Sequence, residues 1–207
     1  MKICAMSDMH GHEIPVPKCD VLAIAGDISR AGDVQWFYYR FVPWLKKYKN
    51  KFSDCFLVFG NHDDKFLLKE LEVPEWLHIL TNKGYTYHGY IFYGTPYIPH
   101  SDEIIKSMCM FKETKLKKAF DMINPHTDVL ITHSPPYGIG DVVKGQNYHL
   151  GSTSLAARVY QIKPKVHIFG HIHTGKKFAE VNGTRFYNVS VLDEQYNVAY
   201  KPMRINL

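Results

Sequence analysis

The sequence predicts an α/β protein in which two packed β-sheets lie between outer layers of helices. Short apolar runs recur along the chain and end in polar clusters. Helical periodicity separates some of these runs, while two other stretches alternate between apolar and polar residues, as antiparallel strands do. A chain of 207 residues with 45% hydrophobic residues can bury such a core, and we expect one domain over residues 1–207.

The continuous apolar runs predict the central strands. Runs of this kind are typical of strands that are buried on both faces. We expect strands at residues 3–7, 21–25, 55–59, 129–132 and 166–169.

Three helices are expected between these strands. Asp33 is a candidate N-cap, because its side chain can accept a hydrogen bond from the first N–H groups of a helix, and apolar residues follow at helical spacing. Residues 104–122 predict a second helix. Residues 152–162 predict a third, which Pro164 ends.

The alternating stretches at residues 79–97 and 178–203 predict antiparallel strands that extend the sheets. Turns are expected at Asn82-Lys83-Gly84 in the first stretch and at Asn182-Gly183 in the second. The longest irregular connection covers residues 135–151, and a long loop beside a site is often functional.

Side chains of the kind that bind metals follow five of the apolar runs. The carboxyl ends of parallel strands open into a common crevice, so we expect these side chains to converge. Residues two apart in an extended chain face the same side, which pairs Asp8 with His10 and His171 with His173. Seven residues form a candidate ligand set that is large enough for two ions: Asp8, His10, Asp27, Asn61, His133, His171 and His173. His62 is not needed in this set and stays available for another role.

The mixture of His, Asp and Asn in this set suits two divalent first-row metal ions. Manganese is the first expectation, with iron, zinc or nickel as alternatives, and magnesium fits less well. Glycine precedes a ligand at positions 26, 60 and 170, where we expect it to leave space for an ion and a phosphate group. Two adjacent ions are suited to the hydrolysis of a phosphate ester.

The ordered set of Asp-x-His, Gly-Asp, Gly-Asn-His-Asp, a later His and Gly-His-x-His resembles the calcineurin-like metallophosphoesterase superfamily over essentially the whole chain. The details most resemble the small metallophosphoesterase-domain-containing proteins. They include Thr132-His133-Ser134-Pro135-Pro136, His149-Leu150-Gly151-Ser152 and the segment 163–173. The resemblance implies a four-layer αββα sandwich of two mixed β-sheets flanked by helices.

The resemblance also implies a role for each site residue. The first ion would be held by Asp8, His10, Asp27 and His173. The second would be held by Asp27, Asn61, His133 and His171, so that Asp27 bridges the two ions. His62 would contact the phosphate and protonate the leaving oxygen, and Asp63 would orient its ring.

The implied reaction is attack on phosphorus by a hydroxide that the two ions share. We expect a phosphodiesterase for a small diester, with cyclic nucleotides as the leading candidates. A phosphomonoesterase, a nuclease of the same superfamily and a non-catalytic binding scaffold remain alternatives. Protein phosphatases of the superfamily carry Gly-Asp-x-x-Asp-Arg-Gly, whereas residues 26–32 place Arg30 one position early, which argues against that activity.

Three further residues are candidates for substrate binding: Arg30, Tyr137 and His149. The net charge of +5 favours an anionic substrate, which we expect to be a small phosphate ester. We expect neither a nucleic-acid polymer nor a membrane as partner, because long basic blocks and apolar runs of membrane-spanning length are both lacking in the sequence. The oligomeric state stays open. Unpaired cysteines and the lack of a signal peptide ahead of the first strand predict a cytoplasmic location.

Overall fold

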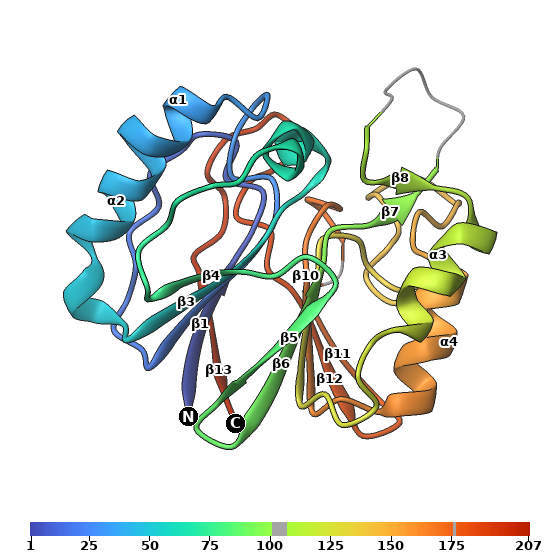
Figure 1. Ribbon diagram of the computed structural model, residues 1–207. Helices are drawn as coiled ribbons and strands as arrows, with labels where there is room; N and C mark the ends of the chain where they lie inside the picture. The colour runs from blue at the N-terminus through green and yellow to red at the C-terminus, as the bar shows by residue number, and fades with distance from the viewer. Residues whose placement is uncertain (101–106, 176) are drawn as a thin grey trace.

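The computed structural model describes residues 1–100, 107–175 and 177–207, which form two β-sheets between outer helices (Figure 1). Within these residues, the first sheet orders its strands as β13 (Met203–Asn206), β1 (Lys2–Met6), β2 (Val21–Ala25), β3 (Asp54–Val58) and β4 (Leu77–Ile79). The second sheet has the order β11 (Phe178–Val181), β12 (Thr184–Asn188), β10 (Val166–Phe169), β9 (Val129–Thr132), β6 (Tyr90–Thr95) and β5 (Lys83–Tyr87).

Both sheets are mixed, as expected. Strands β1 to β4 run parallel, and β13 adds an antiparallel edge beside β1. In the second sheet β12, β10, β9 and β6 run parallel, and β11 and β5 form antiparallel edges. The five apolar runs therefore lie at parallel positions, and their carboxyl ends carry the candidate ligands.

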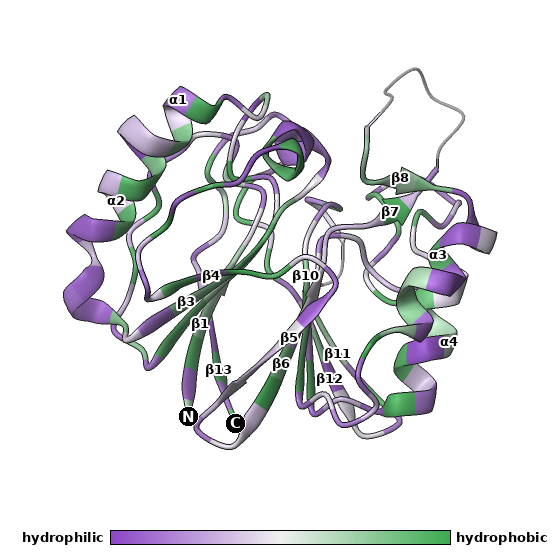
Figure 2. Cartoon of the chain, in the orientation of Figure 1, coloured by the Kyte–Doolittle hydropathy of each residue, from purple (hydrophilic) through white to green (hydrophobic). Residues whose placement is uncertain are grey.

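The two sheets pack face to face through alternating side chains. In β1, Ile3 and Ala5 join a buried cluster with residues of β9 and β10, whereas Cys4 and Met6 face the outer helical layer. This alternation gives the first sheet an apolar surface on both sides, which Figure 2 shows as green strands between more polar helices. The site-bearing strand ends are thereby held at a fixed separation by close packing.

The helix beside the first sheet consists of α1 (Val34–Trp36), a π-helical turn (Phe37–Phe41) and α2 (Val42–Lys47). Asp33 caps it as predicted, because its Oδ1 accepts from the Gln35 N–H at 2.9 Å. The Val42 N–H bonds to the Phe37 carbonyl, five residues back, just before Pro43. Proline has no N–H to donate, and the wider turn accommodates its ring.

Helices α3 (Glu113–Asp121) and α4 (Thr153–Ile162) cover the second sheet. Ser152 caps α4 by accepting from the Leu155 N–H at 3.1 Å, which confirms the third predicted helix. Short 3₁₀ helices span Lys49–Lys51 and Asn61–Leu68. None of the described helices combines the length and the apolar character that a membrane crossing requires.

The second predicted helix begins later than residue 104. Residues 104–106 lie outside the described part of the chain, and β8 (Met110–Phe111) pairs in parallel with β7 (Ile98–Pro99). The helix starts at Glu113, from which Leu116 and Phe120 form a buried face. The apolar residues before Glu113 thus join a long-range strand pair, which local periodicity does not reveal.

The alternating stretches form strands, and the turn predicted at residues 82–84 lies slightly earlier, at the bend of Thr81 and Asn82, where φ of Asn82 is 49°. Lys83 and Gly84 pair with β6 inside the ladder, and the hairpin turns at His88-Gly89, where φ is 47° and 80°. Two residues with positive φ make the turn that hairpins favour, but histidine is a weak signal for it. The turn at Asn182-Gly183 is confirmed, and after β12 the chain crosses to the first sheet as β13.

Candidate metal centre

The predicted ligands converge where the parallel strands end. Ligand atoms lie within 4.8 Å of one another in three groups: Asp8, His10 and His173; His10, Asp27 and His62; and Asp27, His133 and His171. Asn61 joins the third group, because its Oδ1 lies 3.0 Å from His133 Nε2. Asp27 belongs to two groups, which is the position of a bridging carboxylate.

The spacing between these atoms fits metal ions. His133 Nε2 lies 3.3 Å and His10 Nε2 lies 3.7 Å from Asp27 Oδ2, and His173 Nε2 lies 3.7 Å from Asp8 Oδ1. Nitrogen and oxygen ligands that bind one ion at about 2.1 Å stand roughly 3 Å apart. Small inward movements would therefore place these atoms around two ions.

The histidine rings present the correct nitrogens. His133 Nδ1 donates to the Ala25 carbonyl at 2.9 Å, and His173 Nδ1 donates to the Asp193 carbonyl at 2.8 Å. A carbonyl only accepts, so Nδ1 carries a proton in each ring, and Nε2 is the nitrogen that faces the carboxylates. His10 Nε2 is buried and has no hydrogen-bond partner among the described residues. A buried lone pair of this kind costs free energy unless a ligand satisfies it, and a cation does so.

Four of the ligands have a strained backbone. The φ angle is 55° at Asp8, 42° at His10, 51° at Asp27 and 69° at His171. This left-handed conformation costs about 1–2 kcal/mol for a residue with a Cβ, and it collects at functional sites. Here the His171 N–H donates to both Asp8 oxygens at 3.0 Å, and the His10 N–H donates to the Asp27 carbonyl at 3.0 Å. Neighbouring ligand loops thus hold each other in place.

The glycines that precede the ligands do not leave space for an ion, contrary to expectation. A Cβ at Gly60 would clash with Asp27 Oδ1, and a Cβ at Gly170 would clash with Ser7 Oγ and Asp8 Oδ2. The space that these glycines leave is already filled by ligand side chains from neighbouring strands. Gly170 lets strand ends of the two sheets approach closely, whereas Gly60 lets the ends of β2 and β3 approach within the first sheet.

Burial and charge set the protonation of the ligands. Burial lowers the pKa of His10 to about 4, against the opposing charges of Asp27 and Asp8. Burial lowers the pKa of His171 to about 4, with help from the charge of His133. At neutral pH both imidazoles are uncharged, which is the form that binds a metal.

In Asp27 and His133, by contrast, the pKa values shift in favour of the charged forms. Burial opposes the charged form of each, but their mutual attraction and hydrogen bond prevail. The pKa of Asp27 falls below its ordinary value, and that of His133 rises to about 9. In the metal-free protein this buried pair is therefore an ion pair, and a metal ion would replace the His133 proton.

Asp63 does not have the role predicted for it. Its oxygens accept from the N–H groups of Ile28 and Gly60 and from both the N–H and Oγ of Ser29, at 2.8–3.1 Å. These four donors occupy the acceptor positions of the carboxylate. His62 Nδ1 instead lies 3.2 Å from the Arg30 carbonyl. Asp63 thus joins the loops after β2 and β3, and a backbone oxygen orients His62.

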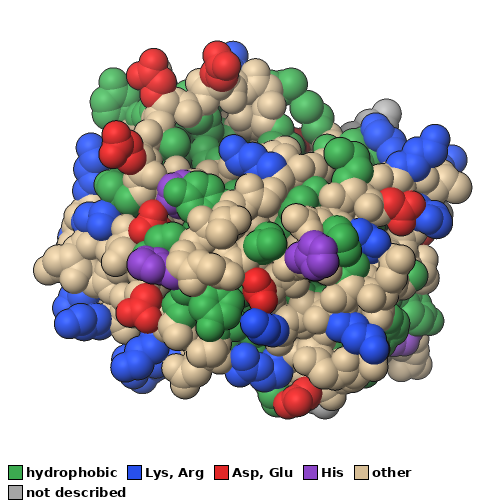
Figure 3. All heavy atoms as spheres, turned by 60° about the horizontal axis from the view of Figure 1, so that its bottom comes forward, with side chains coloured by type: hydrophobic (Ala, Val, Ile, Leu, Met, Phe, Trp, Pro, Cys, Tyr) green, Lys and Arg blue, Asp and Glu red, His purple; other side chains and the backbone are tan. Residues whose placement is uncertain are grey.

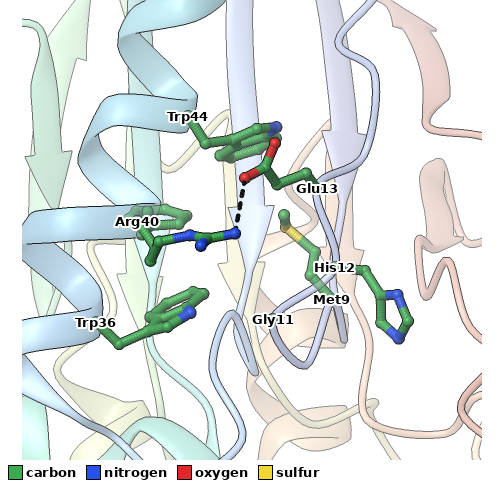
Figure 4. A pocket seen from close by; sticks show the side chains of 8 residues that line it. Met9, Gly11, His12, Glu13, Trp36, Arg40 and Trp44 are labelled. Carbon is green, nitrogen blue, oxygen red and sulfur yellow. Dashed lines mark ion pairs between the residues drawn. The ribbon is translucent and has the colours of Figure 1, made fainter.

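The loop that carries His10 rests against the first helical layer. Figure 4 shows a small crevice between this loop and the helix, with Arg40 between Trp36 and Trp44 and facing Glu13. Arg40 Nη2 lies 3.6 Å from Glu13 Oε1, and both side chains are exposed, so this ion pair contributes little stability. The buried Met9 anchors the loop more firmly.

Two clefts are each lined in part by residues of the ligand cluster. One has a volume of about 360 Å³ and is lined by His10, His12, Arg30, His62 and Tyr196. The other has a volume of about 430 Å³ and includes Asn61, His171 and His149. Arg30 therefore lies beside His62, where its Nε donates to the His10 carbonyl at 3.2 Å. Tyr137 lies against the His149 ring, with ring centroids 4.5 Å apart.

Two residues that contact candidate site residues were not predicted from the sequence. Tyr196 contacts the rings of His10 and His173, with centroids 4.8 and 5.3 Å apart, from a position with φ of 62°. It follows no motif, so the sequence contains no signal for it. Asp141, which holds His149, follows a glycine in the long loop, and that Gly-Asp pair was an available signal.

On one face of the molecule, shown in Figure 3, basic and acidic side chains are interspersed and do not gather by sign. The charge that matters for chemistry lies instead in the buried cluster. Two mixed sheets with paired Asp and His ligands at their strand ends define a metallophosphoesterase type of protein.

Comparison with known proteins supports this class. A family model described as calcineurin-like phosphoesterase matches residues 1–175, and the chain belongs to that family. It is 27% identical to metallophosphoesterase domain-containing protein 1 of Homo sapiens, over all of this chain and 71% of that protein. It is also 27% identical to the UPF0046 protein K07C11.7 of Caenorhabditis elegans, over 98% of this chain and 74% of that protein. The protein is thus a metal-dependent phosphoester hydrolase.

Solved structures share the fold. The protein TT1561 of Thermus thermophilus superimposes with a TM-score of 0.61 at 16% identity, covering 90% of this chain and 88% of that one. The phosphopantetheinyl hydrolase of Mycobacterium tuberculosis gives 0.57 at 15% identity, covering 94% and 90%. The predicted four-layer arrangement of two mixed sheets and flanking helices is confirmed.

Proposed function

We propose that this protein is a phosphodiesterase that hydrolyses a small phosphodiester, with cyclic nucleotides as the leading substrate class. The observation that supports a diester is that two clefts each reach the ligand cluster. A linear diester has two organic groups on one phosphorus, and each cleft offers room for one of them. The single organic group of a cyclic diester is joined to phosphorus through two oxygens, and it would reach into both clefts. A monoester would need only one cleft.

The residues that would hold the metals are Asp8, His10, Asp27 and His173 for one ion, and Asp27, Asn61, His133 and His171 for the other. We propose manganese first, with iron, zinc or nickel as alternatives, because the donors mix imidazole nitrogen with carboxylate and amide oxygen. When bound, such ions supply a nucleophile at neutral pH and neutralise charge on the phosphate oxygens.

His62 would protonate the leaving oxygen. The Arg30 carbonyl near its Nδ1 can only accept, so Nδ1 carries a proton and Nε2 is the nitrogen that exchanges one with the substrate. General acid catalysis of this kind contributes about 10²–10⁴-fold. Arg30 lines the same cleft, where its guanidinium would bind a phosphate oxygen.

Hydrolysis of bis-p-nitrophenyl phosphate and p-nitrophenyl phosphate tests the proposal. The protein is stripped of metal and then assayed without metal and with added manganese, iron, zinc or nickel. We expect faster, metal-dependent cleavage of the diester. A preference for the monoester would indicate a phosphomonoesterase, and no cleavage with any of the four metals would favour the binding scaffold.

The role of His62 has its own test. His62→Ala should lose more activity on diphenyl phosphate than on bis-p-nitrophenyl phosphate, because phenolate needs a proton more than p-nitrophenolate does. The matched control is His126→Ala, which removes an exposed histidine from the loop between α3 and β9. Equal losses on both substrates would contradict proton donation by His62.

A further inference from the structure

A second oriented histidine lies across the ligand cluster from His62. His149 Nδ1 lies 2.9 Å and 3.0 Å from the two oxygens of Asp141. The Asp141 side chain is 1% exposed, and the His149 side chain is 37% exposed. A carboxylate only accepts, so Nδ1 donates to it and Nε2, on the opposite edge of the ring, is the atom available to a ligand.

The long loop is folded around this pair. Asp141 Oδ2 also accepts from the N–H groups of Gly138 at 3.0 Å and Gly151 at 3.2 Å, and the Leu150 N–H donates to the Asp141 carbonyl at 3.0 Å. The Tyr137 ring lies against the imidazole at 40°. A surface histidine held by a buried carboxylate and an aromatic ring has a defined direction, which is what substrate recognition requires.

The cleft that His149 lines combines apolar walls with an end formed by metal-site residues. Its walls include Met110, Val143, Tyr148 and Leu150, and Asn61 and His171 lie at the ligand cluster. A volume of about 430 Å³ is within the range of small-molecule sites. A flat organic group can lie against the apolar wall while its phosphate stays at the cluster.

The position of His62 decides which ester group enters this cleft. His62 would protonate the leaving oxygen, so the leaving group lies in its own cleft with Arg30 and Tyr196. In-line displacement sends the leaving group away from the attacking oxygen, and the group that stays on phosphorus needs a different direction. The cleft lined by His149 is the one that remains.

We propose that His149, oriented by Asp141, is a specificity-determining residue that binds the organic group retained on the phosphate. The chemistry of the cleft fits a nucleoside-like group, with a flat ring for the apolar wall and a hydroxyl or ring atom for His149 Nε2. This inference rests on the proposed phosphodiesterase function and adds the residue that selects the substrate.

Two substrates with the same leaving group test it: thymidine 5′-(p-nitrophenyl phosphate) and methyl p-nitrophenyl phosphate. The variant is His149→Asn, whose amide can still donate to Asp141 but lacks an atom in place of Nε2. We expect kcat/KM for the thymidine ester to fall about 10–100-fold, mainly through KM, because a hydrogen bond to a polar group is lost. The methyl ester should be hydrolysed at the wild-type rate.

Two control variants accompany this test. His149→Ala should show the same selective loss, and His126→Ala should show none. Equal losses on both esters would indicate a structural or proton-transfer role, and no loss on either would exclude contact; both results overturn the proposal.

A failure of the phosphodiesterase function would appear in the wild-type protein, as no hydrolysis of either ester. Calorimetric binding of thymidine 5′-monophosphate and methyl phosphate to the manganese-loaded protein then still tests His149. Weaker binding of the nucleotide alone in His149→Asn supports the contact, and unchanged or absent nucleotide binding overturns it.

Discussion

The two sheets contribute different chemistry to the same centre. The first sheet supplies both carboxylates and the amide, through Asp8, Asp27 and Asn61, together with His10. The second sheet supplies imidazoles alone: His133, His171 and His173. The strain is also unequal, because three of the four strained ligands follow strands of the first sheet.

This difference indicates that neither sheet forms the candidate metal site by itself. Asp27 finds its ion-pair partner in His133, and Asp8 accepts from the His171 N–H, so both candidate ligand carboxylates of the first sheet have a partner in the second. A buried carboxylate without a partner would raise the free energy of the folded state. Packing of the two sheets is therefore a condition for the centre, and the following variants test that dependence.

Removing the shared carboxylate should have the largest effect. Asp27→Ala takes a ligand from both proposed ions, and we expect activity to fall about 10³-fold or more, which corresponds to roughly 4 kcal/mol of transition-state stabilisation. His133→Ala, which affects one ion, should lose less. Metal content per chain and hydrolysis rate measure both variants. Full metal content in Asp27→Ala would contradict the bridging position.

Close approach of the sheets can be tested without removing a ligand. Gly170→Ala places a Cβ against Ser7 Oγ and Asp8 Oδ2, and overpacking of this kind costs about 1–3 kcal/mol. Denaturant unfolding should show that loss together with weaker metal binding. Gly84→Ala is the control, because a Cβ there meets only ordinary contacts. Equal stability of the two variants would argue against the close contact.

The second sheet also contains a buried histidine that has no charged partner among the described residues to offset its burial. Burial lowers the pKa of His167 from its ordinary value of 6.5 to about 3. Protonation therefore favours the unfolded chain: the stability contribution is complete above pH 6.5 and is lost as the pH falls toward 3. Metal-free wild type should lose stability more steeply over this range than metal-free His167→Asn. Parallel curves in denaturant unfolding would contradict the shift.

The smallest effect is expected at the N-cap of the helix beside the first sheet, which supplies no candidate ligand. Asp33→Ala removes the N-cap hydrogen bond to Gln35 and should destabilise the protein by about 1 kcal/mol, seen in denaturant unfolding. Metal content and hydrolysis should not change. A loss of activity would mean that the helix beside the first sheet acts on the centre.

Local sequence patterns predict the buried parallel strands, the candidate ligands and the family. Apolar runs that are buried on both faces have little choice of structure, and polar residues directly after them are brought together by parallel pairing. The amino-acid sequence alone therefore predicts the ligand set of Asp8, His10, Asp27, Asn61, His133, His171 and His173, and the structure brings these side chains together. The N-caps Asp33 and Ser152 are equally local, since a cap depends only on the next turn of chain.

The contacts between the loops around the site follow from tertiary packing alone. The partners of Asp63, the contact between Asp141 and His149 and the position of Tyr196 join residues of loops that have no common periodicity. The strand Met110–Phe111 was mistaken for helix for the same reason, since its partner is the separate strand Ile98–Pro99. Local patterns specify elements, whereas contacts between loops follow from how those elements pack.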